Sequence, residues 1–112
     1  MNIQIYGRSK CFDTKKAQMF FKERRIAFQF VEIDRFSMGK RELETCARAC
    51  GLYELINEKS PLYTSLNLDR MRVPDLICKT LIENPKALKT PIVRNGKFAT
   101  VGFKPDVWKT WE

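Results

Sequence analysis

The sequence predicts an α/β fold made of an N-terminal strand–helix–strand unit, a helical insertion and a C-terminal strand–strand–helix unit. Three observations lead to this prediction. Short apolar runs at 2–6 and 27–34 flank a segment with helical spacing. The middle of the chain continues with helical patterns. Near the C-terminus, two short apolar runs meet at Asn95-Gly96, a pair typical of a hairpin turn.

The N-terminal unit begins with the apolar, β-branched run NIQIY at 2–6. A helix is expected at 14–25, where small and aromatic residues recur at helical spacing, with Asp13 or Thr14 as its N-cap. The run AFQFVEID at 27–34 predicts a second strand. This order indicates a right-handed βαβ unit with two parallel strands.

The helical insertion begins with a helix that is expected to open at Ser37 and to stop at Gly51. Its predicted apolar face consists of Leu43, Cys46, Ala47 and Cys50. Short helices around Pro61 follow, and Pro74 begins a further helix. The predicted apolar stripe of that helix consists of Leu76, Ile77 and Leu81.

The C-terminal unit contains the strands TPIV and KFATVG, joined at Asn95-Gly96, and a last helix at 105–112. A βαβ unit followed by a hairpin and a terminal helix is the thioredoxin arrangement. The chain is therefore predicted to be a single thioredoxin-like domain over 1–112, with a helical insertion between its two units. The chain shows no internal repeat, low-complexity tract or linker that would divide it.

Composition predicts a globular protein, since 44% of the 112 residues are hydrophobic and 30% are charged. The sequence has neither a run of roughly 20 apolar residues nor the layout of a signal peptide, so a cytoplasmic protein that does not enter the membrane is expected. In that reducing compartment, its four cysteines are expected to be free thiols.

The chain contains no histidine. This excludes Cys–His and Ser–His nucleophilic pairs and most zinc sites, because the general base and the imidazole ligand are both missing. No metal site is expected. Thiol chemistry in this protein must therefore depend on a lowered cysteine pKa.

The formal net charge is +8, from 21 Lys and Arg residues against 13 Asp and Glu residues. Nucleic acid, an acidic protein surface, small anions or a merely solvated surface would each fit this charge. The basic residues are spread along the whole chain, and no helix-turn-helix or basic-aromatic stripe is evident. Direct nucleic-acid binding is therefore not expected.

Cys11 is the candidate nucleophile. It falls between the first strand and the first full helical turn, where free N–H groups and the helix dipole favour a thiolate. Positive charge from Arg8, Lys10, Lys15 and Lys16 is expected to lower its pKa further. The alternative is a buried, inert cysteine, against which the polar neighbours argue.

The other three cysteines have apolar neighbours. Cys46 and Cys50 are one helical turn apart, a spacing that would also suit a metal, but no second pair of ligands accompanies them. Cys78 falls in an apolar helical stretch. Core packing is expected for all three.

The residues after Cys11 define the class of thiol site. The position three residues on, where a dithiol site would need its second cysteine, holds Thr14, and a phosphatase loop would need an arginine where Ala17 stands. The site is therefore a single-thiol site whose disulfide is resolved by an outside thiol, and the Thr14 hydroxyl is available to donate a hydrogen bond to the thiolate. Pro91 is either a cis proline facing Cys11, as in a thioredoxin arrangement, or an ordinary proline at a strand entry.

Three stretches carry a resemblance over nearly the whole chain. They are IYGRSKCFDTKKA, GLYELINEKSPLYTSLNL and LIENPKALKTPIVRNGKFATVGFKPD. Together they resemble the arsenate reductase-like (Spx) family of thioredoxin-fold proteins.

The resemblance implies that Cys11 is a redox nucleophile. In true arsenate reductases this cysteine attacks arsenate, three arginines hold the oxyanion, and glutathione with glutaredoxin completes the reduction. The matching positions here are Lys59, Thr90 and Lys104. Two keep positive charge without the planar fork of arginine, and the third is uncharged, which argues against arsenate as the substrate.

Two other branches of the family imply different functions. In the transcriptional regulators, a C-x-x-C switch senses disulfide stress and the protein binds the RNA polymerase α subunit at a surface that Gly51 matches. Thr14 replaces the second switch cysteine here. A third group has a single cysteine and acts as glutathione-dependent thiol reductases, and CFDTKKA is most similar to that group.

Two hypotheses follow from the sequence. In the first, Cys11 serves a glutathione-linked thiol or oxyanion reductase, with no bound cofactor, glutathione as co-substrate, and glutathione or glutaredoxin as partner. Thr90 and Pro91 would support the thiolate, and Lys15, Lys59 and Lys104 would hold an anion such as a glutathione carboxylate. In the second, the chain is a regulator that binds the RNA polymerase α subunit through the surface around Gly51 and catalyses nothing.

Overall fold

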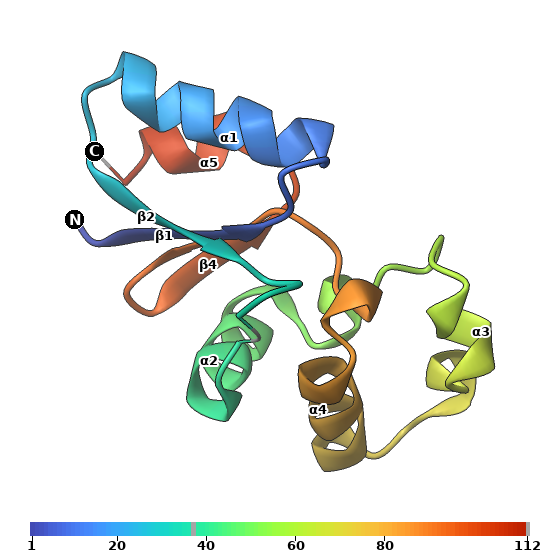
Figure 1. Cartoon of the computed structure of the whole chain (residues 1–112). Coiled ribbons are helices and arrows are strands. Elements are labelled where there is room, and N and C mark those ends of the chain that lie inside the picture. Colours follow the sequence, from blue (N-terminus) through green and yellow to red (C-terminus); the bar gives the residue numbers. More distant parts are fainter. Residues whose placement is uncertain (37, 112) are drawn as a thin grey trace.

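A computed structural model describes residues 1–36 and 38–111 and shows a four-stranded sheet in the order β2-β1-β3-β4 (Figure 1). The strands are β1 (Ile3–Gly7), β2 (Phe28–Glu32), β3 (Ile92–Asn95) and β4 (Phe98–Val101). β1 runs parallel to β2 and antiparallel to β3, and β3 and β4 form the hairpin. The predicted thioredoxin-like topology, with its N-terminal βαβ unit, is confirmed.

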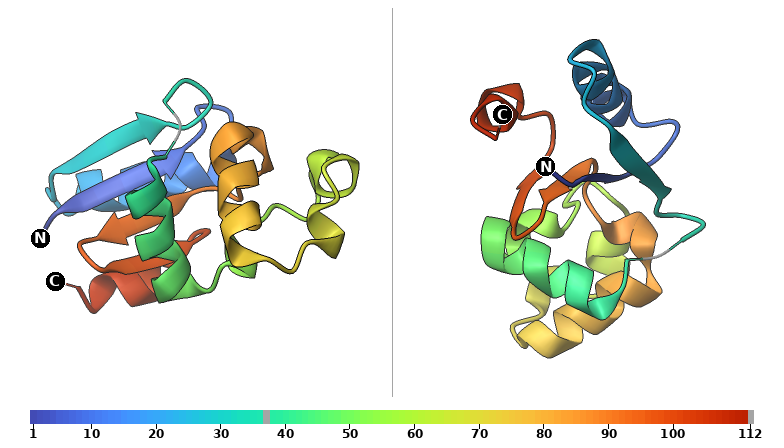
Figure 2. Two further views of the ribbon diagram at one scale, coloured as in Figure 1. Left: turned by 90° about the horizontal axis from the view of Figure 1, so that it is seen from below. Right: turned by 90° about the vertical axis from the view of Figure 1, so that its left-hand side faces the viewer.

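Helices cover both faces of this sheet. They are α1 (Phe12–Glu23), α2 (Lys40–Cys50), α3 (Leu62–Ser65), α4 (Pro74–Glu83) and α5 (Pro105–Lys109), with 3₁₀ turns at Tyr53–Leu55, Leu68–Arg70 and Pro85–Ala87. α1 and α5 lie on one face, whereas α2, α4 and the short helices of the insertion lie on the other (Figures 1 and 2). The insertion between the βαβ unit and the hairpin is helical, as predicted.

The core between the sheet and the α1–α5 face is aromatic. Trp108 of α5 is fully buried, and its ring centroid lies 5.2 Å from those of both Phe20 and Phe21 in α1. Its indole N–H donates to the hydroxyl of Thr100 at 2.8 Å, which satisfies the polar atom of the buried ring. This cluster fixes α1 against the sheet and thereby fixes the loop that precedes it.

The opposite core packs the insertion against the sheet. Leu43, Cys46, Ile77 and Leu81 are fully buried there, and Cys78 is nearly so. The expectation of core packing holds for Cys46 and Cys78, whereas Cys50 at the end of α2 is only half-buried.

One predicted core residue of the α4 stripe is wrong. Leu76 is 46% exposed, while Ile77, Cys78 and Leu81 form the buried face. Leu76 lies five residues before Leu81, which at 3.6 residues per turn turns it away from the buried face.

One predicted helix start differs from the structure. α1 begins at Phe12 with Cys11 as its N-cap, so neither Asp13 nor Thr14 caps it. Thr14 is instead fully buried, packed so closely against Gly7 that a β-carbon there would lie 2.4 Å from the Thr14 methyl carbon. Only glycine allows this approach of β1 to α1.

The next helix, α2, starts at Lys40, with Gly39 as its N-cap and the Glu42 carboxylate accepting the Gly39 N–H at 3.3 Å. The predicted start at Ser37 lies outside the described residues. α2 ends at Gly51 as expected, and φ is +96° there, a conformation that favours glycine. Among the helices of the described residues, none is long and apolar enough to cross a membrane.

Candidate active site around Cys11

Cys11 lies at the end of the loop that connects β1 to α1. Its N–H donates to the Arg8 carbonyl at 3.0 Å, which closes a turn, and its own carbonyl accepts the first helical bond from Lys15 at 3.2 Å. The side chain makes no capping bond and is half-buried. The sulfur is therefore free to interact with the unpaired N–H groups of the first helical turn.

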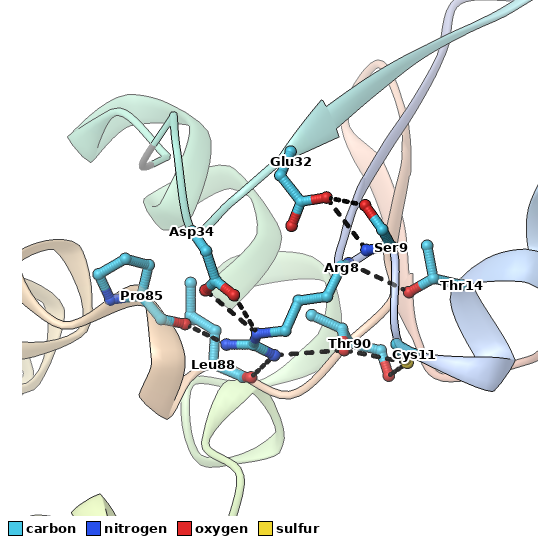
Figure 3. A network of polar contacts seen from close by, with 9 residues as sticks. All are labelled: Arg8, Ser9, Cys11, Thr14, Glu32, Asp34, Pro85, Leu88 and Thr90. Carbon is cyan, nitrogen blue, oxygen red and sulfur yellow. Dashed lines mark hydrogen bonds and ion pairs between the residues drawn. The ribbon is translucent and has the colours of Figure 1, made fainter.

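Four hydrogen-bond donors surround the sulfur. The Thr90 hydroxyl donates to it at 3.2 Å (Figure 3), and the Thr14 hydroxyl and the backbone N–H groups of Asp13 and Thr14 lower the pKa of Cys11 from the first helical turn. Burial of the sulfur raises the pKa of Cys11, but these donors outweigh that effect and hold the pKa below its ordinary value of 9.0. The Thr90 carbonyl, 3.8 Å away, accepts the S–H of the neutral form.

Cys11 is the one cysteine of the four whose pKa is lowered. Burial raises the pKa of Cys46 to about 12, and burial also raises the pKa values of Cys50 and Cys78. At neutral pH, Cys11 is therefore the most ionised thiol in the chain.

Arg8 reaches the sulfur through Thr90. Its Nη1 donates to the Thr90 hydroxyl oxygen at 3.3 Å, which leaves the hydroxyl proton for Cys11 (Figure 3). Its Nε lies 3.2 Å from each carboxylate oxygen of Asp34. The charge of Arg8 is thus paired, and the guanidinium orients the hydroxyl that donates to the sulfur.

Backbone carbonyls complete the environment of the Arg8 guanidinium. The carbonyls of Leu88 and Pro85 accept its Nη1 and Nη2 groups at 3.0 and 2.6 Å. These bonds tie the loop after β1 to the segment that leads into Thr90. Cys11 and Thr90 are 79 residues apart in the sequence. The Arg8 guanidinium holds the loop before Cys11 and the segment before Thr90 together.

Glu32, at the end of β2, holds the same loop from the other side. Its carboxylate accepts the Ser9 N–H at 3.0 Å and the Ser9 hydroxyl at 2.5 Å (Figure 3). Sequence reasoning missed Glu32 and Asp34. A signal was present, because Glu32 ends a strand parallel to β1 and Asp34 follows it, and the carboxyl ends of parallel strands share one edge of the sheet.

Pro91 is buried and follows Thr90 in a cis peptide bond. Its carbonyl accepts the Gly102 N–H at 2.8 Å, and the N–H of Lys89, just before Thr90, donates to the Leu55 carbonyl at 2.8 Å. The Thr90–Pro91 segment is therefore held from both sides, by the C-terminal hairpin and by the insertion.

The three lysines expected to hold an anion line three different hollows. Lys15 is exposed one turn into α1, Lys59 lines a hollow with Lys89, and Lys104 lines another with Cys50. The structure thus brings together Arg8, Cys11, Thr14, Thr90 and Pro91, and it places Lys59 and Lys104 in hollows that Cys11 does not line. The Gly51 backbone is exposed at the end of α2.

The described residues contain no group of three or more histidine, cysteine or carboxylate side chains that would hold a metal ion. Each hydrogen-bond donor at Cys11 is a hydroxyl or a backbone N–H. The chemistry that this site supports is therefore that of a stabilised thiolate.

Comparison with known proteins agrees with the geometry. The family model described as "ArsC family" matches residues 6–111. The global transcriptional regulator Spx 2 of Oceanobacillus iheyensis is 33% identical over 109 residues, which cover 95% of this chain and 80% of that protein.

Solved structures show the same fold. An arsenate reductase from Vibrio cholerae superimposes with a TM-score of 0.85 at 25% identity, covering 96% of this chain and 94% of that chain. The glutaredoxin-like protein NrdH-redoxin from Escherichia coli superimposes with a TM-score of 0.52 at 17% identity, covering 100% of this chain and 96% of that chain, which shows the shared fold. The chain, with its thioredoxin-like sheet and a single hydrogen-bonded cysteine at the start of α1, therefore belongs to the ArsC family.

Proposed function

We propose that the protein is a glutathione-linked thiol oxidoreductase with Cys11 as its only nucleophile. The observation that carries this proposal is the hydrogen bond of 3.2 Å from the Thr90 hydroxyl to the Cys11 sulfur. Together with the donors of the first helical turn, it favours the thiolate, which is the form that attacks a disulfide.

The reaction has two exchange steps. The Cys11 thiolate attacks the glutathione sulfur of a mixed disulfide, so that a Cys11–glutathione disulfide forms and the substrate thiol leaves as a thiolate that takes a proton from water. A second glutathione, as its thiolate, then attacks the glutathione sulfur of that disulfide. Oxidised glutathione leaves and the Cys11 thiolate returns, so the net reaction converts the mixed disulfide and one glutathione thiol into the substrate thiol and glutathione disulfide.

An outside thiol must resolve the intermediate. Thr14 occupies the position where a dithiol site would have its second cysteine, and Cys46 and Cys78 are buried. Their pKa values are raised by burial, as is that of Cys50. Glutathione, or a glutaredoxin carrying it, is therefore proposed as the reductant, with no bound cofactor.

A disulfide fits this site better than an oxyanion does. Lys59 and Lys104, which match two oxyanion-binding positions of arsenate reductases, line two different hollows and so do not face one shared anion site. Thr90, at the third position, directs its hydroxyl to the sulfur. Arg8, the guanidinium of the site, is already paired with Asp34.

A second candidate function is regulation through protein binding. The observation that favours it is the similarity to a protein named as a global transcriptional regulator. In this case the surface around Gly51, exposed at the end of α2, would contact the RNA polymerase α subunit without catalysis.

One pair of assays separates the two functions. The first assay measures reduction of a glutathionylated substrate, followed through coupled regeneration of glutathione. The wild type and Cys50→Ser are expected to be active, and Cys11→Ser is expected to be inactive. Arsenate serves as the competing substrate. Absence of turnover with every substrate, together with retention of the polymerase α subunit by wild type and not by Gly51→Arg, would overturn the enzymatic proposal.

A further inference from the structure

An apolar hollow begins at the residue directly after the nucleophile. Phe12 is 78% exposed, and it lines a hollow of about 290 Å³ between α1 and the loop before α5. Met19 and Phe103, which are 56% and 37% exposed, line it as well. Large apolar side chains grouped in this way on a surface indicate an interaction site.

Two lysines line this hollow in the N-terminal half of α1. Lys15 and Lys16 line it, and the ammonium of Lys16 lies 5.6 Å from the centre of the Phe103 ring. The one acidic lining residue, Glu23, lies at the other end of α1. The hollow is therefore lined mainly by apolar side chains, with two lysines in the half of α1 that follows Cys11.

The hollow lies next to Cys11 along α1, so a substrate at Cys11 can contact it. Lys15 is four residues after Cys11 and donates its N–H to the Cys11 carbonyl, so the two residues share one side of the first helical turn. Phe12 and Lys15 are therefore within reach of a polypeptide whose sulfur reacts at Cys11. Glutathione, a tripeptide without a large apolar side chain, would leave most of this surface uncovered.

We propose that the hollow lined by Phe12, Met19 and Phe103 docks a polypeptide substrate whose reactive cysteine is flanked by a large apolar side chain and by carboxylates. This inference rests on the proposed function and specifies its substrate: a protein mixed disulfide, with glutathione as the reductant. The apolar side chain enters the hollow, and the carboxylates face Lys15 and Lys16.

Two other occupants fit less well. A second copy of the chain would bring together two molecules that each carry a net charge of +8, which opposes association. A nucleic acid would suit the lysines and the aromatic rings, but it contains no sulfur for Cys11 to attack. The adjacent thiolate therefore favours a polypeptide.

The test uses the full-length protein and two glutathionylated synthetic peptides. One carries a leucine and aspartates beside its cysteine, and the other carries serine and asparagines at those positions. The rate constant for transfer of glutathione to Cys11 is measured by mass spectrometry for each. We expect the acidic, apolar peptide to react about tenfold faster, and Phe12→Ser to lower the ratio of the two rates.

The matched control is Phe36→Ser, since Phe36 is also largely exposed, at 62% against 78% for Phe12, and does not line the hollow. It should preserve the ratio. Equal rates for both peptides in the wild type, or a ratio that Phe12→Ser leaves unchanged, would overturn the docking proposal.

Binding without chemistry separates this proposal from the proposed function. The Cys11→Ser protein is titrated with a cysteine-free version of the acidic peptide, and the NMR chemical shift of the Met19 methyl group is measured. A single-stranded oligonucleotide is tested in the same way, alone and as a competitor. Saturable shifts with the peptide support the surface even if wild-type protein fails to reduce any mixed disulfide. Shifts caused by the oligonucleotide alone, or by protein concentration alone, would overturn it.

Discussion

The Thr90 hydroxyl lies 3.2 Å from the Cys11 sulfur, and the Arg8 guanidinium lies 3.3 Å from the same hydroxyl oxygen. The three side chains form a directed series, in which Arg8 donates to Thr90 and Thr90 donates to Cys11. A cation therefore favours the thiolate without touching it, because it orients the donor that does.

Removal of the Thr90 hydroxyl should raise the pKa of Cys11. In Thr90→Val, a hydrogen bond to a charged group is lost, so the rate of reaction with an alkylating reagent at pH 7 should fall about fivefold. The pH dependence of that rate should move to higher pH, with an undiminished plateau at alkaline pH. Thr90→Ser, which keeps the hydroxyl, is the control. A lower plateau at an unchanged pKa would mean that Thr90 affects access rather than ionisation.

Replacement of Arg8 should have an effect that depends on Thr90. Arg8→Met should raise the pKa of Cys11. The same replacement in the Thr90→Val background should change that pKa far less, because the hydroxyl through which Arg8 acts on the sulfur is already absent. A double-mutant cycle on thiolate absorbance near 240 nm measures this coupling. Arg8→Lys is expected to restore little of it, because lysine lacks the fork that reaches Asp34 and Thr90 together. Additive effects of Arg8 and Thr90 would contradict the series.

Gly7→Ala should destabilise the fold and disturb the site together. The new β-carbon would lie 2.4 Å from the methyl carbon of Thr14 and 2.6 Å from its hydroxyl oxygen. Overpacking of this kind costs about 1–3 kcal/mol of unfolding free energy, measurable by urea denaturation. Because Thr14 also bonds to the sulfur, the pKa of Cys11 should rise. Gly39→Ala, which lies at the start of α2 and away from Thr14, should leave the pKa of Cys11 unchanged.

The unfolding free energy should fall between pH 9 and pH 12 because of Cys46. Burial raises the pKa of this thiol from 9.0 to about 12 in the folded protein, so the unfolded chain ionises first as the pH rises. The stabilisation is complete below pH 9 and is lost as the pH approaches 12, by roughly 4 kcal/mol at about 1.4 kcal/mol per pKa unit. Urea denaturation across this range, for wild type and Cys46→Ala, measures the effect.

The difference between the two curves isolates Cys46, since burial also raises the pKa of Tyr6 and both proteins keep that tyrosine. Cys46→Ala should be less stable than wild type at pH 8, because it leaves a cavity, and should lose less stability above pH 9. Parallel curves would contradict the assignment.

Local patterns in the sequence were sufficient for most of the fold. Apolar runs located the four strands, Asn95-Gly96 located the hairpin, and Gly51 located the end of α2. The start of α1 was predicted two or three residues too late, because a capping side chain was expected where Cys11 caps by its backbone conformation alone. Leu76 was misassigned because the register of a short amphipathic helix depends on what packs against it.

The candidate site was less accessible to sequence reasoning. Cys11 and its helix terminus were located from neighbouring residues. The sequence indicated that Arg8 would act as a nearby charge, whereas its partners Asp34, Leu88 and Thr90 come from distant segments that only the tertiary fold brings together. For the same reason, their spacing along the chain could not predict that Lys59 and Lys104 line different hollows.

Thr90 offers the sulfur of Cys11 a partner in each of its protonation states. The neutral thiol donates to the Thr90 carbonyl at 3.8 Å, and the thiolate accepts the Thr90 hydroxyl at 3.2 Å. Gain or loss of the proton changes which of the two groups is bonded, while both remain on one anchored residue. The reorganisation energy of ionisation is therefore small, and the site can cycle between attacking and leaving-group forms without a conformational change of the chain.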